Sequence, residues 1–391
     1  MEEKFYTRPF IGLASTNFLY WIGVYLYIPV LPIYFHTAGM NSQEIGLIVG
    51  SFSLGSVLFR ILGGKAADQY GTVPIVTLGL VITGVAITGY WLTASLLLIL
   101  LLRFLHGIGS ALYSSAAVTM VTLLHSAKQT KRGVAIYTLC SMIGIGFATS
   151  GASWLFQEWG FRGIVLISGI ATWICLLLIP KKIKPREKQA ASSVSIKMIL
   201  LDPKIYLPTL NQFAVYMCYA SVMTYLPLMV YETGTAADMG WFYISYTISV
   251  VVSRFLAGKT VNRIEQKVVS TFLLAILAVV IVLPIFSNEW YFLLVIGTGT
   301  GLGVGLATPV LIGMITDHVD AANRGAALGF FATAIDLGMG AGSILLGMLA
   351  EPFGYASIFI GASLWTLFTC MVYFRGINTK AITIGRISLL L

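Results

Sequence analysis

The chain has 391 residues, of which 58% are hydrophobic and 10% charged, and its mean hydropathy is +0.89. Because about a quarter of the residues of a soluble domain are usually charged, this composition excludes a soluble globular protein. We expect an integral membrane protein that is not an enzyme. The net charge is +9, but no basic patch with interleaved aromatic residues lies outside the apolar runs, so we expect no nucleic-acid partner.

A transmembrane helix needs about 20 predominantly apolar residues, and twelve runs of the sequence meet this need. They are residues 10–36, 43–63, 74–93, 96–124, 133–154, 163–180, 205–231, 238–258, 268–286, 289–316, 325–349 and 354–374. Lysine and arginine gather in alternate connections, and only Arg162 falls on the other side. This bias predicts a multi-pass protein of the plasma membrane with both termini in the cytoplasm.

The first span carries polar and aromatic side chains at helical spacing. Tyr25 and Tyr27 lie near its expected outer boundary, where an aromatic belt is typical. Asn17, Tyr20 and Trp21 lie deeper. They are candidates to line a substrate cavity, and packing between helices is the alternative.

The second and third spans are joined by a polar stretch, residues 60–74. Helical spacing brings Arg60, Lys65 and Asp68 together where two helices are expected to end, with Gly64 and Gly71 beside them. We take these five residues as a candidate cytoplasmic gate.

The sequence repeats itself near its midpoint. Arg254, Gly258 and Lys259 repeat Arg60, Gly64 and Lys65 at an offset of 194 residues, which adds Arg254 and Lys259 to the candidate gate. Further pairs recur at offsets of 192 or 194: Gly107 and Gly109 with Gly299 and Gly301, Arg132 and Gly133 with Arg324 and Gly325, and Gly160 with Gly354. We therefore expect two related halves, 1–180 and 205–391, joined by a polar cytoplasmic linker, 181–204.

The pattern Gly64-x-x-x-Asp68-x-x-Gly71 resembles the loop signature of the major facilitator superfamily. This resemblance extends over the whole chain through the repeat. It implies an all-α integral membrane protein with twelve transmembrane helices in two six-helix bundles. In this family the substrate binds near the middle of the membrane between the bundles, which rock to give alternating access.

The fourth span contains Arg103 inside an apolar run, where a cation is costly and usually functional. Arg103, His106, Ser110 and Ser114 form a polar stripe on one face. The pattern Arg103-x-x-x-Gly107-x-Gly109 also resembles the fourth-span motif of the family's drug and proton antiporters, which implies that the arginine takes part in proton coupling. A buried structural ion pair is the alternative.

The fifth span reads Gly144-x-Gly146 through Gly151 and resembles the glycine-rich antiporter motif at that position. Close helix packing explains small residues equally well. The tenth span has alternate glycines from Gly297 to Gly305, but no strand precedes them, so we favour packing over nucleotide binding.

Four polar positions of the seventh and tenth spans complete the candidate substrate cavity. They are Gln212, Tyr216, Tyr219 and Thr308. In the family that the chain resembles, the first, fourth, seventh and tenth spans line the cavity. His106 of the fourth span belongs to this expected lining as well.

The eleventh span contains Asp336, which we place as the one carboxylate well inside an apolar run. An isolated carboxylate in such a place favours its protonated form, so it can load and release a proton. We take Asp336, Arg103 and His106 as candidate proton-coupling residues. A structural carboxylate held by hydroxyl groups is the alternative, and the sequence does not tell whether Arg103 and Asp336 are neighbours.

The cysteines and histidines suggest no metal site or disulfide. Cys140, Cys175, Cys218 and Cys370 lie in apolar spans without paired spacing, and the four histidines are scattered. We expect no cofactor other than a proton gradient as energy source, and a monomer in the lipid bilayer.

Three functions fit this sequence. The first is proton-coupled export of a small amphipathic compound, such as a drug, a secreted metabolite or a metallophore. The second is proton-linked uptake of a sugar or organic acid, and the third is a non-transporting membrane receptor. The aromatic positions with few fixed charges favour an amphipathic organic substrate, and the antiporter-like motif favours export.

Overall fold

The computed structural model describes residues 5–92, 95–181, 183, 202–232, 239–260, 266–286, 289–319 and 324–387, and their regular structure is helical. Most of the expected linker, 181–204, lies outside the described residues. The side chains of Lys259 and Arg324 do so as well. The boundaries of the two expected halves therefore stay a prediction.

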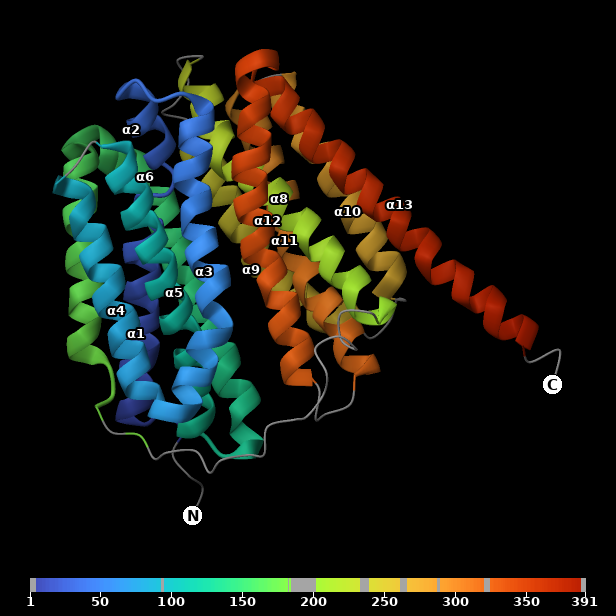
Figure 1. Ribbon diagram of the computed structural model, residues 1–391, viewed down its shortest axis with the longest axis horizontal. Coiled ribbons are helices and arrows are strands. Elements are labelled where there is room, and N and C mark those ends of the chain that lie inside the picture. Colours follow the sequence, from blue (N-terminus) through green and yellow to red (C-terminus); the bar gives the residue numbers. More distant parts are fainter. Residues whose placement is uncertain are drawn as a thin grey trace.

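Two groups of helices stand side by side (Figure 1). The first contains α1 (Arg8–Tyr25), α2 (Leu31–Thr37), α3 (Ser42–Tyr70), α4 (Thr72–Gly89), α5 (Leu96–Leu124) and α6 (Ala127–Leu178). The second contains α8 (Pro203–Glu232), α9 (Met239–Thr260), α10 (Gln266–Val282), α11 (Trp290–His318), α12 (Arg324–Phe353) and α13 (Tyr355–Ile387). Short 3-10 turns, Tyr90–Leu92 and Leu283–Ile285, follow α4 and α10.

Nine helices of the described part are long and apolar enough to cross a membrane. One of them, α6, contains two of the expected spans, which meet where Gly160 adopts a φ of 64°. These helices fit the expected multi-pass membrane architecture, while the full count of twelve spans stays a prediction. Large apolar side chains such as Leu58, Phe147 and Phe272 remain more than half exposed, as expected for helices that face lipid.

Helix α3 is longer than the sequence suggests. It begins with a reciprocal cap. The backbone N–H of Glu44 donates to Asn41 Oδ1 at 2.8 Å, and the backbone N–H of Asn41 donates to the Glu44 carboxylate at 2.9 Å. The helix ends at Gly71, whose φ of 91° favours glycine. The stretch expected to join two spans is therefore mostly helical, and only Gly71 separates α3 from α4.

Glycine lets α3 and α12 approach closely between the two groups. A Cβ on Gly46 would collide with the carbonyl of Ser343 and lie 2.6 Å from the hydroxyl of Tyr225. A Cβ on Gly340 would lie 2.9 Å from that of Ser53. Small residues allow this backbone contact, which helices in lipid use for packing.

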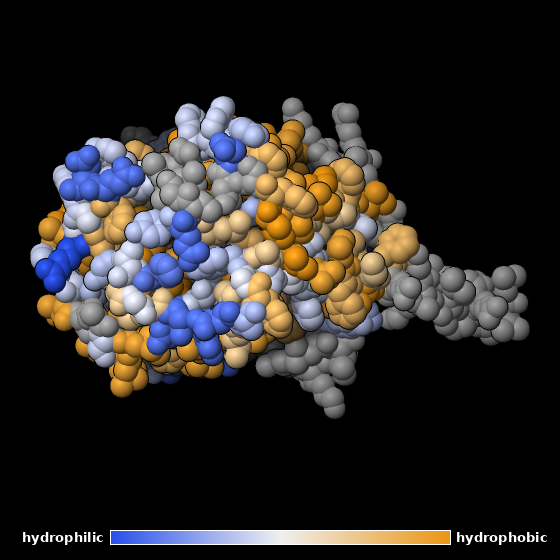
Figure 2. All heavy atoms as spheres, turned by 90° about the horizontal axis from the view of Figure 1, so that it is seen from above, coloured by the Kyte–Doolittle hydropathy of each residue, from blue (hydrophilic) through white to orange (hydrophobic). Residues whose placement is uncertain are grey.

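The two groups meet at the end of the molecule that carries α2, hereafter the α2 end (upper in Figure 1). Ser42 Oγ donates to the hydroxyl of Tyr355 at 3.3 Å, and His36 Nε2 lies 3.4 Å from a carboxylate oxygen of Glu232. Figure 2 looks onto this end and shows hydrophilic patches, with hydrophobic side chains along much of the rim. The chain begins at the opposite end, where α3 and α12 diverge in Figure 1.

Candidate functional site

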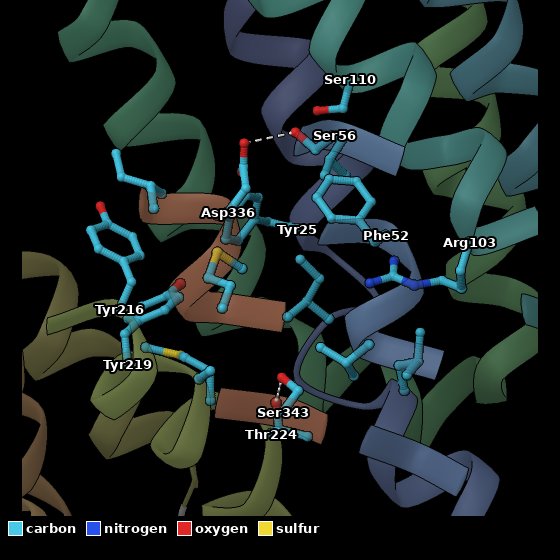
Figure 3. A pocket seen from close by; sticks show the side chains of 18 of the residues that line it. Tyr25, Phe52, Ser56, Arg103, Ser110, Tyr216, Tyr219, Thr224, Asp336 and Ser343 are labelled. Atoms are coloured by element: carbon cyan, nitrogen blue, oxygen red, sulfur yellow. Dashed lines mark hydrogen bonds between the residues drawn. The ribbon is translucent and has the colours of Figure 1, made fainter. Parts of the chain in front are cut away.

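A cavity of about 290 Å³ lies between the two groups of helices. Helices α1, α3, α5, α8 and α12 supply most of its wall (Figure 3). Its aromatic lining consists of Trp21, Tyr25, Phe52, Tyr216 and Tyr219, and its polar lining of Ser56, Arg60, Arg103, Ser110, Ser114, Thr224, Asp336 and Ser343. Such a mixed lining suits a compound with an apolar body and a few polar groups.

An ion pair crosses this cavity from one group to the other. Arg60 Nη2 lies 2.6 Å from Asp336 Oδ2, and Arg60 Nε donates to the same oxygen at 2.7 Å. Ser56 Oγ also donates to it at 3.0 Å. Ser56 and Arg60 are one helical turn apart on α3 and therefore share a face. Asp336, near the middle of α12, is 5% exposed.

Arg103 has its partners within the first group. Its Nε donates to the carbonyl of Ile48 at 3.1 Å, its Nη1 donates to the Tyr27 hydroxyl at 3.3 Å, and its guanidinium lies 4.9 Å from the centre of the Phe52 ring. Figure 3 shows Arg103 and Phe52 on the opposite side of the cavity from Tyr216 and Tyr219. The structure thus pairs Asp336 with Arg60 and holds Arg103 elsewhere.

His106 is fully buried and lies about one helical turn from Arg103 on α5. Its Nδ1 lies 2.9 Å from the Tyr27 hydroxyl and 3.1 Å from the Tyr90 hydroxyl. Its Nε2 has no hydrogen-bond partner among the described residues. Arg103, Tyr27, His106 and Tyr90 therefore form one hydrogen-bonded cluster, which reaches the cavity through Arg103. The proton-coupling roles of Asp336, Arg103 and His106 stay predictions.

The candidate cavity residues of the first span separate into two sets. Trp21 lines the cavity. Asn17 packs inside the first group, where its Nδ2 donates to the carbonyl of Tyr137 at 2.7 Å and its Oδ1 accepts from Trp21 at 3.0 Å. Tyr20 stacks on Tyr113 with 3.8 Å between ring centres and is fully buried.

The candidate cavity residues of the second group also fall into two sets. Tyr216 and Tyr219 line the cavity, whereas Gln212 Nε2 donates to the Thr308 hydroxyl at 3.0 Å in the buried interior. Substrate contact by any of these candidates stays a prediction. In this structure Trp21, Tyr216 and Tyr219 are the ones placed to make it directly.

Two tyrosines expected near the outer boundary of the first span, Tyr25 and Tyr27, are not exposed on the protein surface. Tyr27 is fully buried and lies in the short segment between α1, which ends at Tyr25, and α2, which begins at Leu31. Tyr25 lines the cavity together with Phe52, which the sequence analysis did not single out. Phe52 lies four residues before Ser56 on α3, and this helical spacing is the signal that could have revealed it.

The candidate gate residues differ in their surroundings. Arg60 forms the ion pair, while Lys65 and Asp68 are exposed and make no ion pair within the described part of the chain. Gly64 has open space where a Cβ would be, and Gly71 ends the helix. For Lys259 the structure describes the backbone but not the side chain. The gating role of these residues stays a prediction.

Arg254 on α9 lies apart from the first cavity. It lines a second cavity of about 120 Å³, which shares Tyr25, Tyr216 and Tyr219 with the first. A third cavity of about 370 Å³, between α6 and α9, also reaches Arg254. The Nε of Arg254 is buried without a hydrogen-bond partner among the described residues.

No group of three or more potential metal ligands occurs among the described side chains. The four cysteines are free. The polar groups that converge on the cavity are therefore one carboxylate, two guanidinium groups and several hydroxyls. These groups can bind a polar substrate and hold or release a proton.

Comparison with known proteins identifies related sequences and folds. Two stretches of the chain, residues 13–234 and 208–384, match the family model described as Major Facilitator Superfamily. The multi-drug resistance efflux pump PmrA of Streptococcus pneumoniae is 23% identical over 91% of this chain and 92% of its own. The multidrug resistance protein MdtH of Aeromonas salmonicida is 22% identical over 83% of each chain.

A solved structure shares the fold. It is a bacterial homologue of the human lysosomal transporter Spinster, in an inward-facing and unoccupied conformation. The TM-score is 0.77, with 15% identity, over 96% of this chain and 97% of that one. Such a likeness at low identity concerns the arrangement of the helices.

Proposed function

The chain belongs to the major facilitator superfamily, and from this premise we propose that it is a proton-coupled exporter of small amphipathic organic compounds. It is a multi-pass membrane transporter rather than an enzyme. Drugs and secreted metabolites, metallophores included, are the substrates we consider. We place it in the plasma membrane as a monomer with both termini in the cytoplasm.

The observation that carries this proposal is the position of Asp336. Its carboxylate lines a cavity that the two groups share and is held by a cation of the other group. A proton on this carboxylate removes the charge that attracts Arg60. Loss of one charge of a buried pair costs about 3–5 kcal/mol, and with 27% of the Arg60 side chain exposed we expect the lower end. Protonation can thus change how firmly α3 and α12 are joined.

Alternating access follows from where the groups meet. They are joined at the α2 end and from there to the ion pair at mid-helix. With the termini in the cytoplasm, the described state is inward-facing. Lys65 and Asp68 are then exposed because their end of the molecule is open. In the outward-facing state we expect Asp68 to meet the N-terminus of α12, since helix N-termini attract carboxylates.

Export is supported by two relatives whose names denote multidrug resistance or efflux. It is also supported by the composition of the cavity. Aromatic rings on both sides can hold a flat apolar compound, and the polar groups between them can orient it.

Transport by the purified protein tests the proposal. The protein is reconstituted into vesicles that contain a pH-sensitive dye, and ethidium or 8-anilinonaphthalene-1-sulfonate is supplied on one side. An imposed pH gradient should drive a compound of this class against its own gradient, with protons moving the opposite way.

The direction of proton movement decides between the candidates. Protons that move together with the compound would make the chain a symporter, as the uptake alternative requires. Transport that is indifferent to the pH gradient would remove proton coupling from the proposal.

A further inference from the structure

The repeat in the sequence gives Arg60 a counterpart but gives Asp336 none. Arg254 corresponds to Arg60 at an offset of 194 residues. The same offset relates two packing contacts. A Cβ on Gly340 would meet Ser53, and a Cβ on Gly146 would meet Thr247. The contact of α6 with α9 therefore follows the register of the contact of α12 with α3.

In this register the two positions that correspond to the partners of Arg60 carry apolar side chains. Met142 stands where Asp336 would be, and Val250 stands where Ser56 would be. Met142, Val250 and Arg254 line the same second cavity. One copy of the repeat thus has a carboxylate and a hydroxyl that bind the arginine, and the other copy has an empty space.

Arg254 consequently has no anionic partner in the described part of the chain. Its Nε is buried and unpaired, and the rest of the cavity wall near it consists of tyrosine, threonine and apolar side chains. A partly buried guanidinium is costly without a counter-charge. An anion that enters the cavity would supply this charge and could bind two N–H groups at once.

We propose that Arg254 is an anion-binding subsite for an amphipathic substrate that carries one carboxylate, sulfonate or phosphate group. Tyr25, Tyr216 and Tyr219 belong to both the first and the second cavity, so one molecule can place its acidic group at Arg254 and its apolar body in the larger cavity. This inference rests on the proposed function and narrows its substrate class to organic anions.

Two matched probes separate charge from shape. The first, 8-anilinonaphthalene-1-sulfonate, is an aromatic anion. The second, N-phenyl-1-naphthylamine, has the same rings without the sulfonate. Each is titrated by fluorescence into the full-length protein in lipid nanodiscs, and the signal of empty nanodiscs is subtracted.

Replacing the cation should affect the anionic probe alone. Because a hydrogen bond to a charged group contributes about 1.5–3 kcal/mol, Arg254→Gln should weaken its binding roughly ten- to a hundredfold. Binding of the neutral probe should change less than about twofold. Arg254→Lys should retain most of the affinity, and Arg162→Gln, which removes an exposed cation elsewhere, should change neither probe.

A carboxylate can also be introduced beside Arg254. Met142→Asp should pair with Arg254 and reduce anion binding as strongly as Arg254→Gln. Met142→Asn, which adds no charge beside Arg254, should reduce it less. An equal loss of both probes in Arg254→Gln, or no loss of the anion, would overturn the subsite. Should Met142→Asp not fold, the Arg254 variants still decide.

Binding and transport can fail separately. Titration at equilibrium needs no gradient, so selective anion binding without proton-driven transport would contradict the proposed function and leave the subsite intact. Proton-driven transport of ethidium by a protein that does not bind the sulfonate would support the proposed function and overturn the anion-binding subsite.

Discussion

Arg60 and Asp336, which are 276 residues apart in the sequence, meet with 2.6 Å between Nη2 and Oδ2 in the interior of the protein. Each comes from a different group of helices. The pair therefore connects two bodies that must move relative to each other if the chain transports by alternating access. Its strength depends on the charge of Asp336, and this is the physical basis of the first prediction.

Asp336→Asn should abolish uphill transport and retain downhill exchange. The amide can still accept hydrogen bonds from Ser56 and Arg60, so we expect the fold to persist. A proton moving across one pH unit can sustain an about tenfold concentration difference, and the variant should sustain none. Accumulation of the probe in vesicles, with and without a pH gradient, measures both quantities.

Glu351→Gln is the control, because Glu351 is an exposed carboxylate at the α2 end. This variant should move protons and substrate at the wild-type ratio. If Asp336→Asn still moves protons with the substrate at the original ratio, the coupling group lies elsewhere, and His106 becomes the first alternative.

The second prediction concerns the cluster around Arg103. Tyr27→Phe removes the hydroxyl that accepts from Arg103 and faces His106. An unsatisfied buried group costs about 1–3 kcal/mol, so the variant should unfold at a lower temperature in detergent. Because all three residues belong to one group of helices, the ratio of protons to substrate should not change.

Tyr34→Phe is a suitable comparison, since Tyr34 stacks on Phe161 through its ring and would lose only its hydroxyl. Its stability should stay near that of the wild type. A changed proton ratio in Tyr27→Phe would instead assign the cluster to the coupling path, as the antiporter-like motif implies.

The sequence predicts an all-helical membrane architecture, because twenty apolar residues in succession have few alternatives to a membrane helix, whereas the count of twelve spans stays a prediction. It also predicts that Arg103 and Asp336 lie in the interior. It does not predict the partner of Asp336, because that choice depends on the register of α3 against α12. Contacts such as that of Gly340 with Ser53 set this register, and they form only between distant segments.

The direction of each side chain is a second feature that the sequence does not predict. Asn17, Tyr20 and Trp21 all occupy polar or aromatic positions of one helix, yet only Trp21 reaches the cavity. Asn17 faces Tyr137 of α6 instead. Spacing identifies the face of a helix, but the neighbour on that face is known only once the helices are packed.

The third prediction concerns the candidate gate. Asp68→Asn should impair transport without loss of folded protein, because the amide cannot provide the negative charge expected at the N-terminus of α12. Such an interaction is worth about 0.3–1 kcal/mol, which corresponds to a roughly two- to fivefold change between the two states. The initial rate of transport, normalised to the amount of folded protein, is the measurement.

Asp317→Asn provides the comparison at the end of α11. Asp317 is exposed and accepts from Gln266 at 3.0 Å within its own group. We expect its rate to be unchanged. A wild-type rate in Asp68→Asn would mean that the charges of this stretch serve only to orient the chain in the membrane.

The fourth prediction concerns the closed α2 end. Gly46→Ala places a methyl group against the Ser343 carbonyl and the Tyr225 hydroxyl, so α3 and α12 must move apart there. We expect the equilibrium to shift toward a state that is open at this end. Gly240→Ala on α9 is the control, because its methyl group would also enter open space and Gly240 belongs to neither candidate gate.

Labelling reports the shift in population directly. Ser343 is fully buried in the described state, and a cysteine at this position in a protein without its four native cysteines should react slowly with an external maleimide. Because overpacking costs about 1–3 kcal/mol, Gly46→Ala should speed the reaction by roughly five- to a hundredfold. Gly240→Ala should leave the rate unchanged. Equal rates in all three proteins would show that the contact of α3 with α12 yields without opening, and the α2 end would then not be the closed gate of this state.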